Sequence, residues 1–89
     1  MNRIKKADLD HKVNELNRIT GNPSQPWNTE TRKANPGCYV LQGAYSGWQL
    51  QQIVSESGGV DAINHGYISK REMYDFLQAY TWGIQGATL

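Results

Sequence analysis

Residues 38–49, Cys-Tyr-Val-Leu-Gln-Gly-Ala-Tyr-Ser-Gly-Trp-Gln, decide the fold class because two different patterns meet within them. In the first eight residues, side chains such as Tyr39 and Leu41 share one side of a period-two alternation, which predicts a strand. The last four, Ser46 to Gln49, have the Ser-x-x-Gln spacing of a helix capping box. The stretch therefore predicts a strand that is followed directly by a helix over 46–57.

Two further helices are expected on either side. Residues 8–20 carry apolar side chains at three- and four-residue spacing, and Gly21 with the following proline is a typical helix stop. A second capping box, Ser69-Lys70-Arg71-Glu72, predicts a helix over 69–82 that ends at Gly83.

The predicted strand needs a pairing partner. Either the 27–33 segment supplies it, which makes 27–45 a hairpin region, or the same strand of a second copy does. The predicted fold class is α+β, with an N-terminal helix, a short antiparallel β-hairpin and two C-terminal helices in one small domain, 1–89.

Composition excludes several classes of protein. The 89 residues have a net charge of only +1, which argues against a strongly electrostatic partner. Three Trp and five Tyr argue against disorder. No apolar run approaches the ~18 residues of a membrane span, and no apolar segment follows the basic N-terminus as a secretory signal requires. The single cysteine, Cys38, fits a reducing cytoplasm, so we expect a cytoplasmic protein with no membrane partner.

Charge is distributed unevenly along the chain. Residues 1–33 hold seven basic and four acidic side chains, whereas residues 34–69 hold no Lys or Arg. A basic N-terminal helix therefore precedes a nearly uncharged body that is rich in Tyr and Trp. This split offers two surfaces for binding, one basic and one aromatic.

Catalytic and metal chemistry is poorly supported. The strand alternation makes Cys38 a small buried hydrophobe rather than a nucleophile, and the two histidines lie on different predicted elements. Residues 61–72 resemble a calcium loop, with Asp61, Ser69 and Glu72 at ligand positions, but Ile63 and His65 occupy two positions that need oxygen. A turn followed by a capping box explains the segment better. We expect no enzyme, no cofactor and no metal, with calcium at Asp61, Ser69 and Glu72 as the weak alternative.

Three binding functions stay open. An aromatic surface of Tyr45, Trp48 and Trp82 predicts a protein partner, because Trp and Tyr concentrate at interfaces. A homodimer is a further alternative. Tyr and Trp near a helix N-terminus could stack a nucleotide base, which predicts a nucleotide-sequestering protein. Nucleic-acid binding would use the basic side chains of the N-terminal helix and the last helix. These are Arg3, Lys5, Lys6, Lys12, Arg18, Lys70 and Arg71.

A further pattern is carried by short segments between the first predicted helix and Gly83, namely Leu16–Gly21, Pro23, Pro26-Trp27, Gly37–Leu41, Gly43–Leu50, Gly58–Val60, Lys70–Tyr74, Leu77, Ala79 and Gly83. In these segments the chain resembles a group of small, mostly uncharacterised tailed-bacteriophage proteins. The resemblance implies a viral gene product made in the bacterial host cytoplasm, and it implies no catalytic residue. We therefore expect a non-catalytic accessory protein that binds a host protein.

Overall fold

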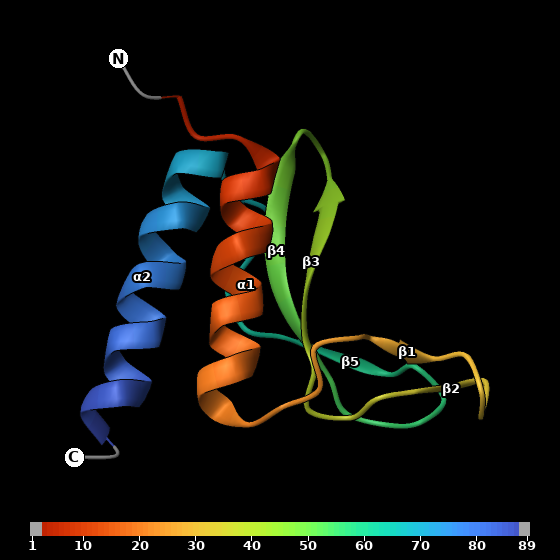
Figure 1. Cartoon of the computed structure of the whole chain (residues 1–89). Helices are drawn as coiled ribbons and strands as arrows, with labels where there is room; N and C mark the ends of the chain where they lie inside the picture. Colours follow the sequence, from red (N-terminus) through yellow and green to blue (C-terminus); the bar gives the residue numbers. More distant parts are fainter. Residues whose placement is uncertain (1–2, 88–89) are drawn as a thin grey trace.

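A computed structural model describes residues 3–87, in which two helices cover one face of a three-stranded antiparallel sheet (Figure 1). The sheet has the strand order β3-β4-β5, and β1 pairs with β2 in a separate small hairpin. Within residues 3–87, no helix is long and apolar enough to cross a membrane. In chain order the elements are α1 (Lys6–Thr20), β1 (Trp27–Asn28), β2 (Lys33–Ala34), β3 (Tyr39–Ala44), β4 (Gly47–Ile53), β5 (Val60–Ala62) and α2 (Lys70–Ala87).

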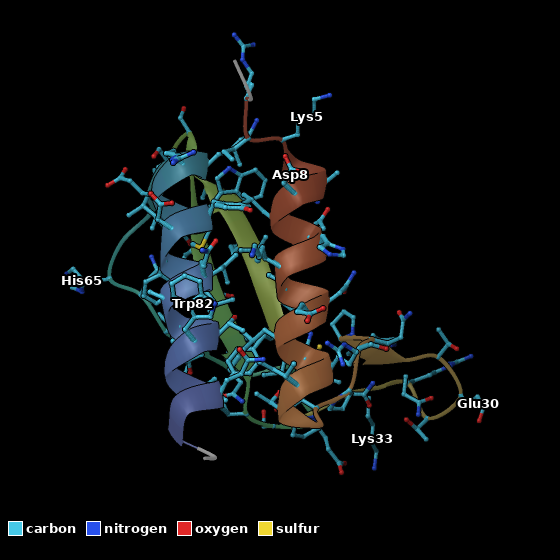
Figure 2. The ribbon with its side chains drawn as sticks, turned by 60° about the vertical axis from the view of Figure 1, so that its left-hand side comes forward. Lys5, Asp8, Glu30, Lys33, His65 and Trp82 are labelled. Atoms are coloured by element: carbon cyan, nitrogen blue, oxygen red, sulfur yellow. The ribbon has the colours of Figure 1, made fainter. Side chains whose placement is uncertain are left out.

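Helix α1 confirms the prediction over 8–20 and begins two residues earlier. At its start the Asp8 carboxylate accepts a hydrogen bond from the backbone N–H of Lys5 at 2.8 Å, and Figure 2 shows these two residues together there. At its end Gly21 adopts φ 72°, and its N–H donates to the Arg18 carbonyl. This left-handed conformation is open to glycine at no steric cost, which explains the stop.

The predicted helix over 46–57 is wrong, because residues 47–53 form strand β4. Tyr45 and Ser46 adopt φ values of 51° and 58°, and Ala44 pairs with Gly47 across them. Two consecutive residues with positive φ make the turn that matches the twist of a β-hairpin. Ser46 is thus a turn residue and not a helix cap, so residues 3–87 contain two helices and not three.

The predicted hairpin over 27–45 is also wrong in its pairing. The 27–33 segment turns back on its own continuation, with Trp27 opposite Ala34, while β3 pairs along its whole length with β4. The six-residue register from Tyr39 opposite Gln52 to Ala44 opposite Gly47 offers far more backbone pairing than the two-residue strand β1 could.

Helix α2 confirms the second capping box and extends past the predicted end. The Ser69 hydroxyl accepts the Glu72 N–H, and the Glu72 carboxylate accepts the Ser69 N–H, each at 3.1 Å. Gly83 does not end the helix, which runs from residue 70 to residue 87. Ile84 packs against the core and offsets the helical cost of glycine, about 1 kcal/mol.

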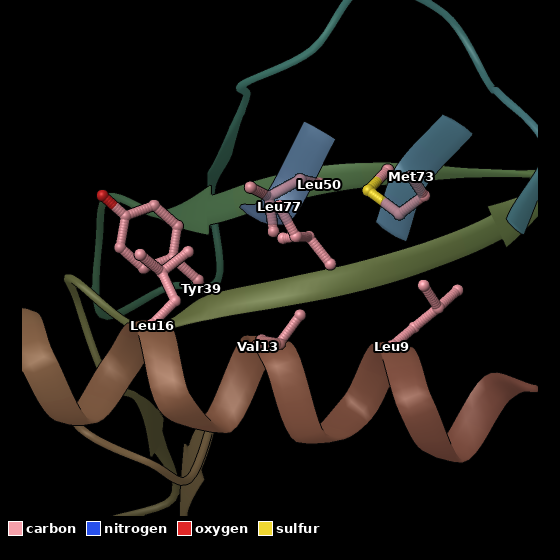
Figure 3. Close-up of a cluster of buried hydrophobic side chains, with 7 residues drawn as sticks. All are labelled: Leu9, Val13, Leu16, Tyr39, Leu50, Met73 and Leu77. Carbon is pink, nitrogen blue, oxygen red and sulfur yellow. The ribbon is translucent and has the colours of Figure 1, made fainter. Parts of the chain in front are cut away.

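The core lies between the two helices and the inner face of the sheet (Figure 3). Leu9, Leu16, Leu50, Met73 and Leu77 have no exposed surface. Because paired residues of an antiparallel sheet share a face, the pairing of Leu41 with Leu50 places both beneath the helices. The opposite face carries Gln42, Gln49 and Gln51.

Candidate functional site

A pocket of about 420 Å³ lies where the N-terminal segment, the β3–β4 turn and the first turn of α2 come together. Three of its lining residues are basic, two carry hydroxyls and two are apolar. They are Arg3, Ile4, Ser46, Trp48, Ser69, Lys70 and Arg71.

Backbone pairing places the start of α2 beside the hairpin. The N–H of Trp48 donates to the Ile68 carbonyl and the N–H of Ile68 donates to the Trp48 carbonyl, both at 2.8 Å. Ser69 follows at once as the helix cap, so its hydroxyl and the first helical side chains lie beside Trp48. The pocket therefore depends on the hairpin, which brings Ser46 to the same place.

The pocket is electropositive. Within residues 3–87, Arg3 and Lys70 form no ion pair, and Arg71 contacts Asp75 only at 3.5 Å between exposed side chains. Glu72 is close in sequence, but hydrogen bonds from the Ser69 N–H and hydroxyl lower the pKa of its carboxyl and hold it in the capping box. The partial positive charge of a helix N-terminus adds to the three cationic side chains.

Trp48 forms part of the pocket wall and is not a bare stacking surface. Its six-membered ring lies against Gly43, where an added Cβ would come within 3.0 Å of the indole. The Lys6 ammonium lies over the ring at 5.9 Å from the centroid. The prediction that Trp48 stacks a base at a helix N-terminus is therefore poorly matched by its surroundings.

The three aromatic residues predicted to form one binding surface are not brought together. Tyr45 is 91% exposed at the β3–β4 turn, with its ring edge-on to Tyr67 at 5.4 Å. Trp82 is 64% exposed on α2 (Figure 2). It lies twelve residues after Lys70, which is roughly 18 Å along the helix. Trp48 lines the pocket, Tyr45 precedes the lining residue Ser46 in the chain, and Trp82 is a separate feature.

The predicted nucleic-acid residues also divide into groups. Arg3, Lys70 and Arg71 meet in the pocket, and Lys5 precedes α1 on the exposed surface. The others lie along α1 with partners of their own: Lys6 pairs with Asp10 at 2.9 Å, Lys12 lies 5.0 Å from the Tyr74 ring centroid, and Arg18 pairs with Glu15 at 2.6 Å. Of the seven basic residues, three therefore line one pocket and the other four do not.

The buried ionisable groups are held in their protonated forms. Burial raises the pKa of the Cys38 thiol, and only 1% of the residue is exposed. Burial also raises the pKa of Tyr39 to about 12, assisted by the hydrogen bond of 3.2 Å between its hydroxyl and that of Tyr80. His11 and His65 are exposed on α1 and on the loop before α2, so neither lies ready to deprotonate the buried thiol.

The calcium alternative gains no support from the geometry. Asp61 lies in strand β5, opposite Gln52, and the segment that precedes the loop is a strand and not a helix. Glu72 and Ser69 bond to each other in the capping box. Among residues 3–87, no three His, Cys, Asp or Glu side chains lie close enough together to hold a metal ion.

Sequence reasoning did not assign Ile4 or Ser46 to a site, and it assigned Ser69 only to the weak calcium alternative. Ser46 and Ser69 were both interpreted as helix caps, and Ser46 reaches the pocket only because the chain reverses there. The available signal was the two-residue spacing between strand-like segments on either side of Tyr45-Ser46. No family model, curated protein or solved structure matches this chain.

Proposed function

We propose that the protein acts by binding, without catalysis, and that the pocket at the start of α2 takes a phosphate-bearing ligand. The observation that carries the proposal is the convergence of Arg3, Lys70 and Arg71 on one pocket of about 420 Å³. A nucleotide and a nucleic-acid backbone share this chemistry, and both are among the functions that the sequence predicts.

The hydrogen-bonding groups around the pocket suit a phosphate. The capping box uses the N–H groups of Ser69 and Glu72, which leaves those of Lys70 and Arg71 without a partner inside the described chain. Backbone N–H groups at a helix start, together with Lys and Arg, are the usual donors to phosphate oxygens. The hydroxyl of Ser46 adds a further donor at the wall.

The test compares inorganic phosphate, a mononucleotide and a short single-stranded oligonucleotide by calorimetry at two salt concentrations. We expect Lys70→Gln to weaken binding at least several-fold. Lys33→Gln removes the same charge in strand β2, which does not line the pocket, and should leave binding unchanged. Oligonucleotide binding that weakens with salt identifies nucleic acid. Saturable binding of the mononucleotide alone identifies a nucleotide site. Equal binding by the two variants, or no binding of any probe, would contradict the proposal.

A second candidate function is favoured by the exposure of Trp82. Large aromatic side chains that are 64% exposed are typical anchors of protein interfaces. The partner expected here is a host protein, and that expectation rests on the resemblance to phage proteins. One stoichiometric host protein retained by the wild-type chain and lost with Trp82→Ala supports this candidate. Equal retention by both contradicts it.

A further inference from the structure

The outer edge of β3 carries backbone groups with no partner in the sheet. Trp48 directs its N–H and C=O toward Ile68, and Leu50 directs its own toward Ile63 and Asn64. Neither therefore bonds to its opposite residue on β3, which is Gly43 for Trp48 and Leu41 for Leu50. Because hydrogen-bonded and non-bonded pairs alternate, the N–H and C=O groups of alternate β3 residues point away from β4.

One end of this edge is closed by a side chain of α1. The Asn17 amide donates to the Tyr39 carbonyl at 3.1 Å, and its oxygen accepts the Tyr39 N–H at 2.7 Å. A buried amide thus takes the place of a neighbouring strand at Tyr39. Leu41 and Gly43 each retain one outward donor and one outward acceptor.

The rest of the edge lacks the usual protection against strand pairing. Natural edge strands commonly carry Lys, Pro or a bulge. Residues 34–55 contain no charged side chain, β3 has no proline, and its pairing with β4 has no bulge. Figure 1 shows β3 at one outer side of the sheet, whereas residues 60–68 run along the other side of β4. Helix α1 packs on the inner face of β3, where Tyr39 and Leu41 join the core.

We propose that this edge pairs with the same edge of a second copy of the chain, antiparallel and centred on Gln42. In that register Leu41 of each copy lies opposite Gly43 of the other. Each of these two pairs forms two backbone hydrogen bonds, which makes four in all. Centring on Leu41 would require the outward N–H and C=O of Tyr39, which already bond to the Asn17 amide. Centring on Gly43 would require Tyr45, where the chain turns at φ 51°. Only the Gln42 register uses every open group.

The side chains at the two-fold axis are compatible with self-pairing. Gln42 is exposed on the sheet face opposite the helices, and its amide offers both a donor and an acceptor to its own copy. The absence of charge on β3 means that two identical edges meet without like charges. The result is a continuous six-stranded sheet, with an interface that is isologous and closed.

Disulfide trapping tests the register. In a non-hydrogen-bonded pair the two Cα atoms lie about 4.5 Å apart, which falls within the range of about 4.4–6.8 Å that a disulfide spans. We expect Gln42→Cys to form a covalent dimer under mild oxidation. Gln51→Cys, on the same face of the central strand, should not, and the buried Cys38 should not contribute. Equal cross-linking of the two variants would overturn the proposal.

Charge exchange provides a second test in solution. Gln42→Lys and Gln42→Glu each place like charges across the axis, so each should sediment as a monomer at concentrations where the wild-type chain dimerises. An equimolar mixture of the two should restore the dimer. The proposal is wrong if the wild-type chain stays monomeric at every concentration, or if the mixture behaves as its components do. Binding of the edge only to an extended peptide from another protein would also overturn it.

Discussion

Replacing Asn17 by leucine should destabilise the protein strongly, although leucine suits the position by two ordinary criteria. Leucine has nearly the branched shape of asparagine, it is more apolar, and it has the higher helix propensity. Asn17 is only 1% exposed and lies near the C-terminal end of the amphipathic helix α1, which ends at Thr20. A change that improves both burial and propensity isolates the hydrogen bonds as the cause of any loss.

The magnitude follows from the two backbone groups of Tyr39. Asn17 bonds both the N–H and the C=O of that residue, and leucine would leave the N–H without a partner and the C=O with only the weak thiol donor of Cys38 at 3.5 Å. Each unsatisfied group costs about 1–3 kcal/mol. After subtracting a few tenths of a kcal/mol for better propensity, we expect a loss of roughly 2–5 kcal/mol in the free energy of unfolding. For a domain of this size that corresponds to a fall of about 10–30 °C in Tm.

The assay is urea unfolding followed by circular dichroism, together with a thermal melt. Asn14→Leu is the matched control, because Asn14 lies on the exposed side of the same helix and makes the same change in propensity. We expect the control to stay within about 0.5 kcal/mol of wild type. If Asn17→Leu is as stable as Asn14→Leu, the amide does not hold the edge of β3 and the reasoning is refuted.

Three further changes should alter stability. Replacing Tyr45-Ser46 by Asn-Gly should raise the free energy of unfolding in urea by about 1–2 kcal/mol. Tyr45 and Ser46 both have positive φ, which asparagine and glycine tolerate in a hairpin turn. An unchanged urea midpoint would contradict this. Thr81→Val should stabilise by about 1 kcal/mol in a thermal melt, because the buried Thr81 hydroxyl has no hydrogen-bond partner among residues 3–87; a lower Tm would show that the hydroxyl is satisfied. The pKa of Glu72 is lowered in the folded state, so its contribution is present above pH 4.5 and lost as pH falls through the folded pKa. Acid titration of Glu72→Gln should therefore show a smaller loss of stability than wild type, and equal losses would refute the role of the carboxylate.

The sequence predicts the helices that carry a complete local signal. Helix α1 has an apolar stripe and a glycine stop, and α2 has a capping box in which both hydrogen bonds form. The predicted stop at Gly83 is wrong because the next residue, Ile84, packs against the core and keeps the helix going. Glycine inside a helix costs only about 1 kcal/mol, and one partly buried isoleucine offsets it.

The error at residues 46–57 arises because a capping-box spacing and a hairpin turn use the same residue types. Ser46 fits the cap position of a helix, but in the structure it is the second residue of the two-residue turn Tyr45-Ser46, and Gly47 begins β4. What decides between them lies far along the chain: Ile68 pairs with Trp48, and the Asn64 side chain accepts the Leu50 N–H at 2.6 Å. No local pattern contains these contacts. The pocket was missed for the same reason, since it forms only when the hairpin reaches the start of α2.

The amide-rich composition acquires a structural role once these contacts are known. A three-stranded sheet has few strands with which to satisfy its own backbone, and Asn17 and Asn64 each complete a strand edge from outside it. Gln49 donates to the carbonyls of Asn64 and Gly66, and Gln52 donates to that of Gly37, which binds the loops to the sheet. Neutral amides can do this at partly buried positions where charged side chains would pay desolvation. The low charge of residues 34–69 is therefore a consequence of how the sheet is completed. Arg3, Lys70 and Arg71, which meet in the pocket, lie outside this stretch, on either side of it.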